Sequence, residues 1–225
     1  NTAFSVVVHH EYGHHLVAVV GSGQGQYGEG MGDVMGVLLT GDNQLARGFY
    51  SDDCENGIRN ADNNKQYPCN GGIHDCGQLI SGCVWDTLIT MENAYGAAGH
   101  DIVSSLAVNS MLMHTGDGIS PSITYDWLTL DDDDGDLDTG TPHFAEINAG
   151  FGMHNMEIPM PAIFISYPNG RPTLFDPNGG THLAINVIGN TAQPIVGSGL
   201  FHWNDGSLGW QQSPLSPASD SDYEA

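Results

Sequence analysis

Two histidines and a glutamate near the start of the chain form the pattern H-E-x-x-H, at His10, Glu11 and His14. On a helix, residues four apart share a face, so both imidazoles can reach one Zn²⁺ ion. Glu11 lies one step around the helix, where it can act as general base toward a water molecule. The alternative is a His-rich polar helix face without a metal, because a short pattern with three fixed positions also occurs by chance.

A second acidic pattern, G-E-G-M-G-D, follows one loop later and contains Glu29 and Asp33. Glu29 would complete a His₂Glu ligand set with the fourth position open, which is typical of catalytic rather than structural zinc. Asp33 lies one helical turn later and could accept the remaining N–H of a ligating histidine. The exchanged assignment, with Asp33 as ligand, stays open, although the longer Glu29 side chain and its neighbouring glycines favour Glu29. The alternative for both is a helix-terminal acid and a solvated Asp.

A third feature is His74, which opens a predicted helix after the segment Asn70-Gly71-Gly72-Ile73. A histidine at such a loop edge can donate a hydrogen bond to an oxyanion that forms on a zinc-bound substrate. For an isolated histidine, a helix-capping or core position is the alternative.

Taken in order, the three motifs resemble the gluzincin zinc metallopeptidases, of the thermolysin-like and fungalysin-like kinds. The segment Gly57-Ile58-Arg59-Asn60 is similar to the arginine segment of that family, and residues 141–153 resemble the last helix of its catalytic domain. The resemblance covers about residues 4–155. It implies zinc-dependent hydrolysis of protein or peptide substrates, with these roles: ligands His10, His14 and Glu29, a supporting Asp33, the base Glu11, and transition-state donors His74 and Arg59.

The chain departs from the family in several places. The loop between His14 and Glu29 is shorter, and Tyr27 is the nearest substitute for a tyrosine expected before the third ligand. The acid that usually orients the catalytic histidine, five residues before it, is Cys69 here. The β-rich lobe that lines one wall of the family's cleft is not in this sequence. We therefore expect a piece of a longer protein that is inactive on its own.

The apolar periodicity predicts helices over residues 3–20, 30–39, 73–91, 99–114 and 142–154. From residue 159 onward, prolines and the alternation of Leu183, Ile185 and Val187 favour strands, with a hairpin turn at Asn204-Asp205-Gly206. We expect a mostly α catalytic lobe over residues 1–158. Residues 159–225 should form a partial all-β immunoglobulin-like sandwich, because a complete one needs roughly 100 residues.

The charge of the chain restricts its partners. Its 225 residues contain 27 acidic and 4 basic side chains, a formal net charge of -23. Nucleic acids and anionic membranes require a Lys/Arg surface, so both are excluded as partners. No apolar run approaches the roughly 20 residues that span a bilayer, so we expect no membrane insertion. Cations and neutral or basic substrates remain, and the sequence does not specify an oligomeric state.

Four cysteines, at 54, 69, 76 and 83, lie close together but lack the paired spacing of a zinc ribbon. Disulfides suit a secreted or cell-surface protein. Cys76 and Cys83 are roughly 10 Å apart if both lie on one helix, too far for a bridge. We therefore favour a Cys54–Cys69 disulfide, with four reduced cysteines as the alternative.

An acidic run from Asp131 to Asp138 surrounds Gly135. Alternating carboxylates around a turn could form a Ca²⁺ site, for which the candidate ligands are Asp132, Asp134, Asp136 and Asp138. The EF-hand pattern is excluded because positions 130 and 141 are Leu130 and Thr141. A solvated acidic loop is the simpler alternative. The rival function for the whole chain is a non-catalytic, calcium-stabilised surface or adhesion module that retains a relic zinc site.

Overall fold

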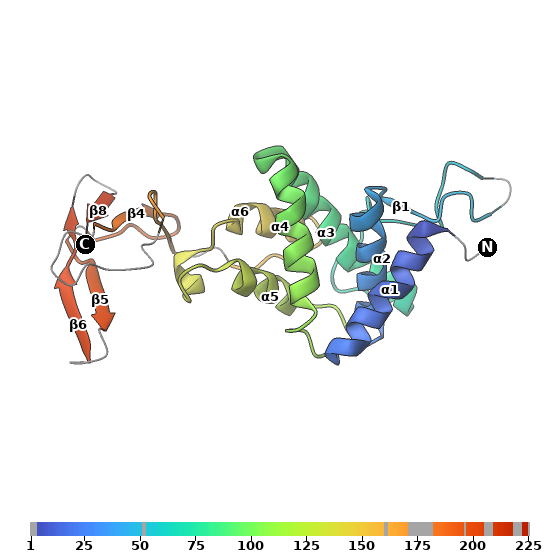
Figure 1. Cartoon of the computed structure of the whole chain (residues 1–225), viewed down its shortest axis with the longest axis horizontal. Helices are drawn as coiled ribbons and strands as arrows, with labels where there is room; N and C mark the ends of the chain where they lie inside the picture. Colours follow the sequence, from blue (N-terminus) through green and yellow to red (C-terminus); the bar gives the residue numbers. More distant parts are fainter. Residues whose placement is uncertain are drawn as a thin grey trace. The chain divides into compact units, whose positions relative to one another are not determined.

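The chain divides into a helical part and a part built from short strands (Figure 1). The computed structural model describes residues 4–50, 53–159, 162–170, 182–195, 197–204, 209–217 and 222–224. One compact unit, here called the helical unit, comprises Asn1–Asp131 and His143–Ile158. The other, the strand unit, comprises Asp132–Pro142 and Pro159–Ala225. The acidic run therefore belongs mostly to the strand unit, although residues 132–142 fall within the expected helical lobe, residues 1–158.

The helical unit contains α1 (Ser5–Val20), α2 (Gln26–Thr40), α3 (Ile73–Tyr95), α4 (Ala97–Ser110), α5 (Ser122–Asp131) and α6 (Phe144–Gly152). Helix α2 packs against α1 and α3, and α3 also packs against α4 and α6 (Figure 1). Trp127 of α5 and Phe151 of α6 are fully buried and meet edge to face at 5.2 Å between ring centroids. No helix among the described residues is long and apolar enough to cross a membrane.

Five of these helices are the predicted ones, with two differences. Helix α2 begins at Gln26, four residues before the predicted start at Gly30. Its first turns contain Gly28, Gly30 and Gly32, which have low intrinsic helix propensity, so packing of the helix on both sides outweighs that preference. Helix α5 is not among the predicted helices, because it has only ten residues and these run directly into the acidic segment.

Glycines let the first three helices approach very closely. A Cβ atom added to Gly13 of α1 would lie 2.7 Å from the Cα of Gly32 on α2. A Cβ added to Gly30 of α2 would lie 2.7 Å from the carbonyl oxygen of Gly77 on α3. Larger residues at these points would push the backbones apart. The spacing of the three helices, and of every side chain they carry between them, therefore depends on these glycines.

A short antiparallel pair follows α2. Strand β1 (Gln44–Leu45) pairs with β2 (Arg59–Asn60), with Leu45 opposite Arg59. The pair packs against the helices, because β1 contacts α2 and β2 contacts α3. Strand β2 thereby holds Arg59 over the helical layer.

The strand unit contains a four-stranded antiparallel sheet and a separate hairpin. The sheet has the order β3 (Ile163–Ser166), β4 (Ala184–Gly189), β8 (Asp222–Glu224) and β7 (Ser216–Pro217). The hairpin joins β5 (Leu200–Asn204) to β6 (Trp210–Pro214), which confirms the predicted hairpin, although Asp205 and Gly206 of its turn lie outside the described residues. The 3₁₀ helix η1 (Leu137–Thr139) contacts β3.

A small hydrophobic cluster lies among the described residues of the strand unit. Its buried members are Leu183 and Ile185, with partly buried neighbours Ile165, Tyr167, Val187, Phe201 and Leu215. The described residues form no immunoglobulin-like sandwich, so the expected all-β character is present and the expected sandwich is not shown.

Candidate metal centre

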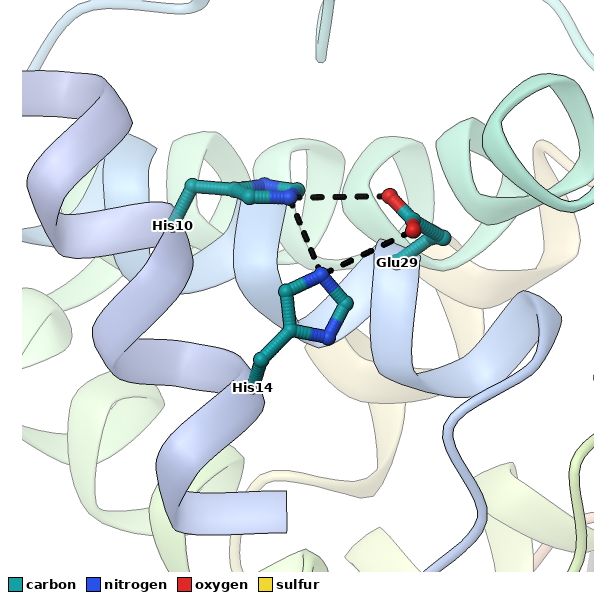
Figure 2. Close-up of side chains that lie close together, drawn as sticks. All are labelled: His10, His14 and Glu29. Atoms are coloured by element: carbon teal, nitrogen blue, oxygen red, sulfur yellow. Dashed lines mark hydrogen bonds and ion pairs between the residues drawn. The ribbon is translucent and has the colours of Figure 1, made fainter. Parts of the chain in front are cut away.

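Three of the predicted ligands meet at one point. His10 and His14 project from successive turns of α1 toward Glu29 of α2 (Figure 2). The two Nε2 atoms are 3.1 Å apart, and Glu29 oxygens lie 3.5 Å from His10 Nε2 and 3.6 Å from His14 Nε2. Ligands on a tetrahedral zinc ion are about 3.3 Å apart when each bond is about 2.0 Å. The three side chains are therefore spaced as ligands of one metal ion.

Asp33 supports this group and is not part of it. Its Oδ1 lies 2.7 Å from Nδ1 of His10, on the side of the ring away from Glu29. An ionised carboxylate can only accept, so the His10 Nδ1 atom carries the hydrogen, and in the neutral imidazole Nε2 then presents a lone pair. Asp33 is fully buried. The structure thus groups Glu29, rather than Asp33, with the two histidines.

Arg59 holds Asp33 in place. Its Nε and Nη2 atoms donate to the two Asp33 oxygens, each at 2.7 Å, in a bidentate pair. Such a pair fixes the plane of the carboxylate and therefore the ring of His10 that depends on it. Arg59 also lines the cavity beside the three candidate ligands. The guanidinium that pairs with Asp33 is therefore the one predicted to contact substrate.

A cavity of about 270 Å³ opens beside the three ligands. Glu11, His74 and Arg59 line it together with the ligands. Its remaining walls are apolar, formed by Val6, Val7, Leu45, Ala46, Phe49 and Ile58. The cavity brings the predicted base and both predicted donors to the same space as the metal ligands.

His74 lies in the first turn of α3, with its Nε2 3.3 Å from Oε1 of Glu29. Its side chain is 62% exposed, so it is not packed into the core. A polar atom at this distance from a ligand oxygen can reach a group bound in the cavity.

The disulfide next to His74 differs from the predicted one. Cys69 bonds Cys76, with a Cα–Cα distance of 5.6 Å, while Cys54 is free and exposed and Cys83 is free and buried. The prediction of Cys54–Cys69 was wrong because the turn at residues 70–72 folds Cys69 back onto the start of α3. The exclusion of a Cys76–Cys83 bridge agrees with the structure, in which Cys83 is a free thiol. His74 lies inside the loop that the disulfide closes.

Tyr27 does not reach the cavity. It is fully buried, and its ring stacks on His114 at 3.9 Å between centroids. Burial raises the pKa of its hydroxyl. Tyr27 is therefore a core residue and no substitute for the family's tyrosine.

Gln24, which is not among the predicted site residues, contacts His14, one of the three candidate ligands. Its Oε1 lies 2.8 Å from Nδ1 of His14, and its amide nitrogen donates to the His14 carbonyl oxygen at 3.0 Å. Nothing in the local pattern singles out a glutamine in a turn. The contact depends on how the segment between α1 and α2 reverses direction.

Only some of the predicted calcium ligands in the acidic run lie close together. Asp132, Asp133 and Asp134 have carboxylate oxygens within 4.8 Å of one another, whereas Asp136 and Asp138 lie outside that group. Many of its oxygens accept hydrogen bonds from the loop's own backbone. These bonds run to Asp132 from Gly135 N at 2.7 Å, to Asp134 from Asp136 N at 2.9 Å, and to Asp136 from Asp138 N at 3.0 Å.

Each basic side chain among the described residues is paired with a carboxylate. Arg47 binds Asp42 at 2.7 Å, Lys65 binds Asp75 at 2.6 Å, and Arg59 binds Asp33. The fourth, Arg171, lies outside the described residues. In the described part of the chain, each cation is therefore committed to a carboxylate partner.

No protein family, curated protein or solved structure matches the chain. The chemistry of the site itself is therefore the basis for assigning a function.

Proposed function

We propose that this chain is the zinc-bearing helical part of a gluzincin-type metallopeptidase that hydrolyses protein or peptide substrates. The observation that carries the proposal is the convergence of two imidazoles and one carboxylate on one point. The Nδ1 atoms of His10 and His14 contact Asp33 and Gln24, and their Nε2 atoms, 3.1 Å apart, both face Glu29. The Glu29 Oε2 atom is buried and accepts no hydrogen bond from the described residues.

Such an arrangement is unfavourable without a cation, because buried acceptors that face one another repel and lack donors. A divalent ion removes the conflict. Two imidazoles and one carboxylate match zinc better than calcium or magnesium, which prefer oxygen ligands alone. A His₂Glu set leaves one coordination position open, and the cavity beside the ligands gives that position access to substrate.

The residues around the cavity match the requirements of peptide hydrolysis. Zinc would supply Lewis acidity and lower the pKa of a water molecule in the site. Glu11 is not in the ligand group and lines the cavity, so it can take the proton from the attacking water and pass it to the leaving amine. His74 and Arg59 can donate to the oxygen that gains charge in the transition state.

Two further observations are compatible with the proposal. The Cys69–Cys76 disulfide is consistent with an extracellular protein, and we propose that the protein is secreted or displayed at the cell surface. The net charge of -23 favours neutral or basic substrates over acidic ones.

The rival proposal is a non-catalytic module in which calcium at the acidic run stabilises the fold. The clustering of Asp132, Asp133 and Asp134 is the observation in its favour. The two proposals differ in what they require of Glu11. A relic site can bind zinc but has no need of a base.

The deciding experiment measures zinc content and hydrolysis of quenched peptides in the full-length protein, with any segments that precede or follow these residues. Glu11→Gln should keep one zinc ion per chain and lose about a thousandfold in kcat, because the water loses its base. His14→Ala should lose zinc and activity together. Glu55→Gln, which changes an exposed glutamate outside the cavity lining, is the matched control and should retain both.

A wild-type protein that carries zinc and cleaves none of a varied set of peptides would refute the enzyme proposal. So would full activity in Glu11→Gln. Either result leaves the calcium-stabilised module as the better account.

A further inference from the structure

The turn between α1 and α2 places one exposed glutamine against a metal ligand. Gln24 makes two hydrogen bonds to the same residue, His14. One joins its Oε1 to the His14 ring nitrogen Nδ1 at 2.8 Å. The other joins its amide nitrogen to the His14 backbone carbonyl at 3.0 Å. The side chain therefore clamps both the ring and the main chain of His14.

The second bond determines the orientation of the Gln24 amide. A backbone carbonyl oxygen can only accept, so the NH₂ end of the amide must face it. The oxygen end must then face Nδ1 of His14, which makes Nδ1 the donor. In a neutral imidazole the other nitrogen, Nε2, then carries the lone pair that a metal needs. The two bonds together select the metal-binding tautomer of His14.

The two histidine ligands thus have different supports. His10 relies on Asp33, which is buried and charged, and His14 relies on Gln24, which is neutral and exposed. Gly28 leaves the room for this second support. A Cβ atom at Gly28 would lie 3.0 Å from Gln24 Oε1 and 3.5 Å from His14 Nδ1.

We propose that Gln24 is the positioning residue of His14, which fixes the tautomer and ring orientation needed for zinc. This rests on the proposed function, because it takes His10, His14 and Glu29 as the zinc ligands. Gln24 acts through His14 and does not touch substrate. Loss of a hydrogen-bond partner of a metal-bound histidine weakens metal binding by about 10- to 100-fold.

The test is a zinc titration against a competing chelator in the full-length protein. Gln24→Ala should raise the zinc dissociation constant by about 10- to 100-fold. Gln24→Glu keeps an oxygen acceptor for Nδ1 and should restore most of the affinity. Gln66→Ala is the matched control, because the exposed Gln66 also donates its amide to a backbone carbonyl, that of Met153 at 2.7 Å, away from the metal ligands. It should leave zinc affinity unchanged.

A second readout uses the Co²⁺-loaded protein, whose visible absorption reports ligand geometry. Gln24→Ala should alter that spectrum and Gln66→Ala should not. A purely structural role predicts instead a lower unfolding midpoint of the metal-free Gln24→Ala protein with unchanged zinc affinity and an unchanged cobalt spectrum. That result overturns the inference while the zinc site stands. Wild-type protein that binds no zinc overturns both the inference and the proposed function.

Discussion

Two clusters in this chain have the composition of a cation site, and their hydrogen bonds differ. In the helical unit, His10, His14 and Glu29 come from two helices, and the outward-facing nitrogens of both histidines are already occupied. In the strand unit, Asp132, Asp133 and Asp134 are neighbours in one loop. Oxygens of Asp132 and Asp134 accept hydrogen bonds from nearby backbone N–H groups.

The comparison shows that suitable atom types alone do not make a cation site. The atoms must also lack other hydrogen-bond partners. The helical group has a buried acceptor, Glu29 Oε2, with no hydrogen-bond donor among the described residues, which is the condition that a metal relieves. The acidic loop satisfies much of its own acceptor capacity through local turns, as short Asp-rich segments often do. We therefore expect the helical group to respond strongly to changes in its surroundings and the acidic loop weakly.

The largest effect should come from Gly32→Ala. A Cβ at this position would lie 2.6 Å from Nδ1 of His10, so the ring must move away from Asp33 and Glu29. Zinc affinity should fall by about a hundredfold, as for loss of a ligand's hydrogen-bond partner. The metal-free protein should lose about 1–3 kcal/mol through overpacking between α1 and α2.

Chelator competition and urea unfolding measure the two quantities. Gly118→Ala is the control, since a Cβ there meets nothing within 4 Å, and it should change stability by less than about 0.5 kcal/mol. Equal zinc affinity in the two variants would contradict the view that glycine contacts set the position of the ligands.

An intermediate effect should follow from opening the disulfide. Cys69→Ser frees the turn before α3, so His74 is held less firmly beside Glu29. The free energy of unfolding should fall by about 2 kcal/mol. For the proposed peptidase activity of the full-length protein, kcat should fall by roughly tenfold while zinc stays bound, because only the donor is misplaced.

Cys54→Ser, which removes an exposed free thiol, is the control and should change neither quantity. If turnover is unaffected in Cys69→Ser, the disulfide has no part in placing His74.

The smallest effect should be that of calcium on the acidic run. If the loop binds Ca²⁺ with a dissociation constant of about 1 mM, 10 mM calcium adds about 1.4 kcal/mol to the free energy of unfolding. The unfolding midpoint should then rise by about 3 °C. Asp132→Asn should remove the rise, and Asp101→Asn on exposed α4 surface should keep it.

The calcium measurement is best made in the His14→Ala background, where the zinc site cannot contribute. A midpoint that is the same in calcium and in EDTA would leave the solvated acidic loop as the correct interpretation.

The sequence predicts the helical unit well, because its evidence is periodic and local. The apolar spacing identifies α1, α3, α4 and α6, and the i, i+4 spacing of His10 and His14 puts both rings on one face. Glu29 follows from its residue type and its closeness to that helix along the chain.

Features that depend on how separate segments turn could not be predicted. The Cys69–Cys76 bridge requires the path of residues 70–72, and the contact of Gln24 with His14 requires the path of residues 21–25. The Arg59–Asp33 pair joins a strand to a helix 26 residues away. The early start of α2 was missed because Gly28, in the missed first turn, has poor helix propensity, which the packing of the helix on both sides outweighs.

The pairing of Arg47, Arg59 and Lys65 with carboxylates has a consequence for metal capture. Each described base is paired with one acid, and with 27 acidic against 4 basic residues the chain keeps a formal net charge of -23. The resulting potential concentrates divalent ions near the surface, where a site with three acceptors can take them up. Because mobile ions screen exposed charges beyond about 10 Å at 0.1 M ionic strength, the rate of zinc uptake should decline as salt is added, while the bound state, built from short contacts, is affected much less.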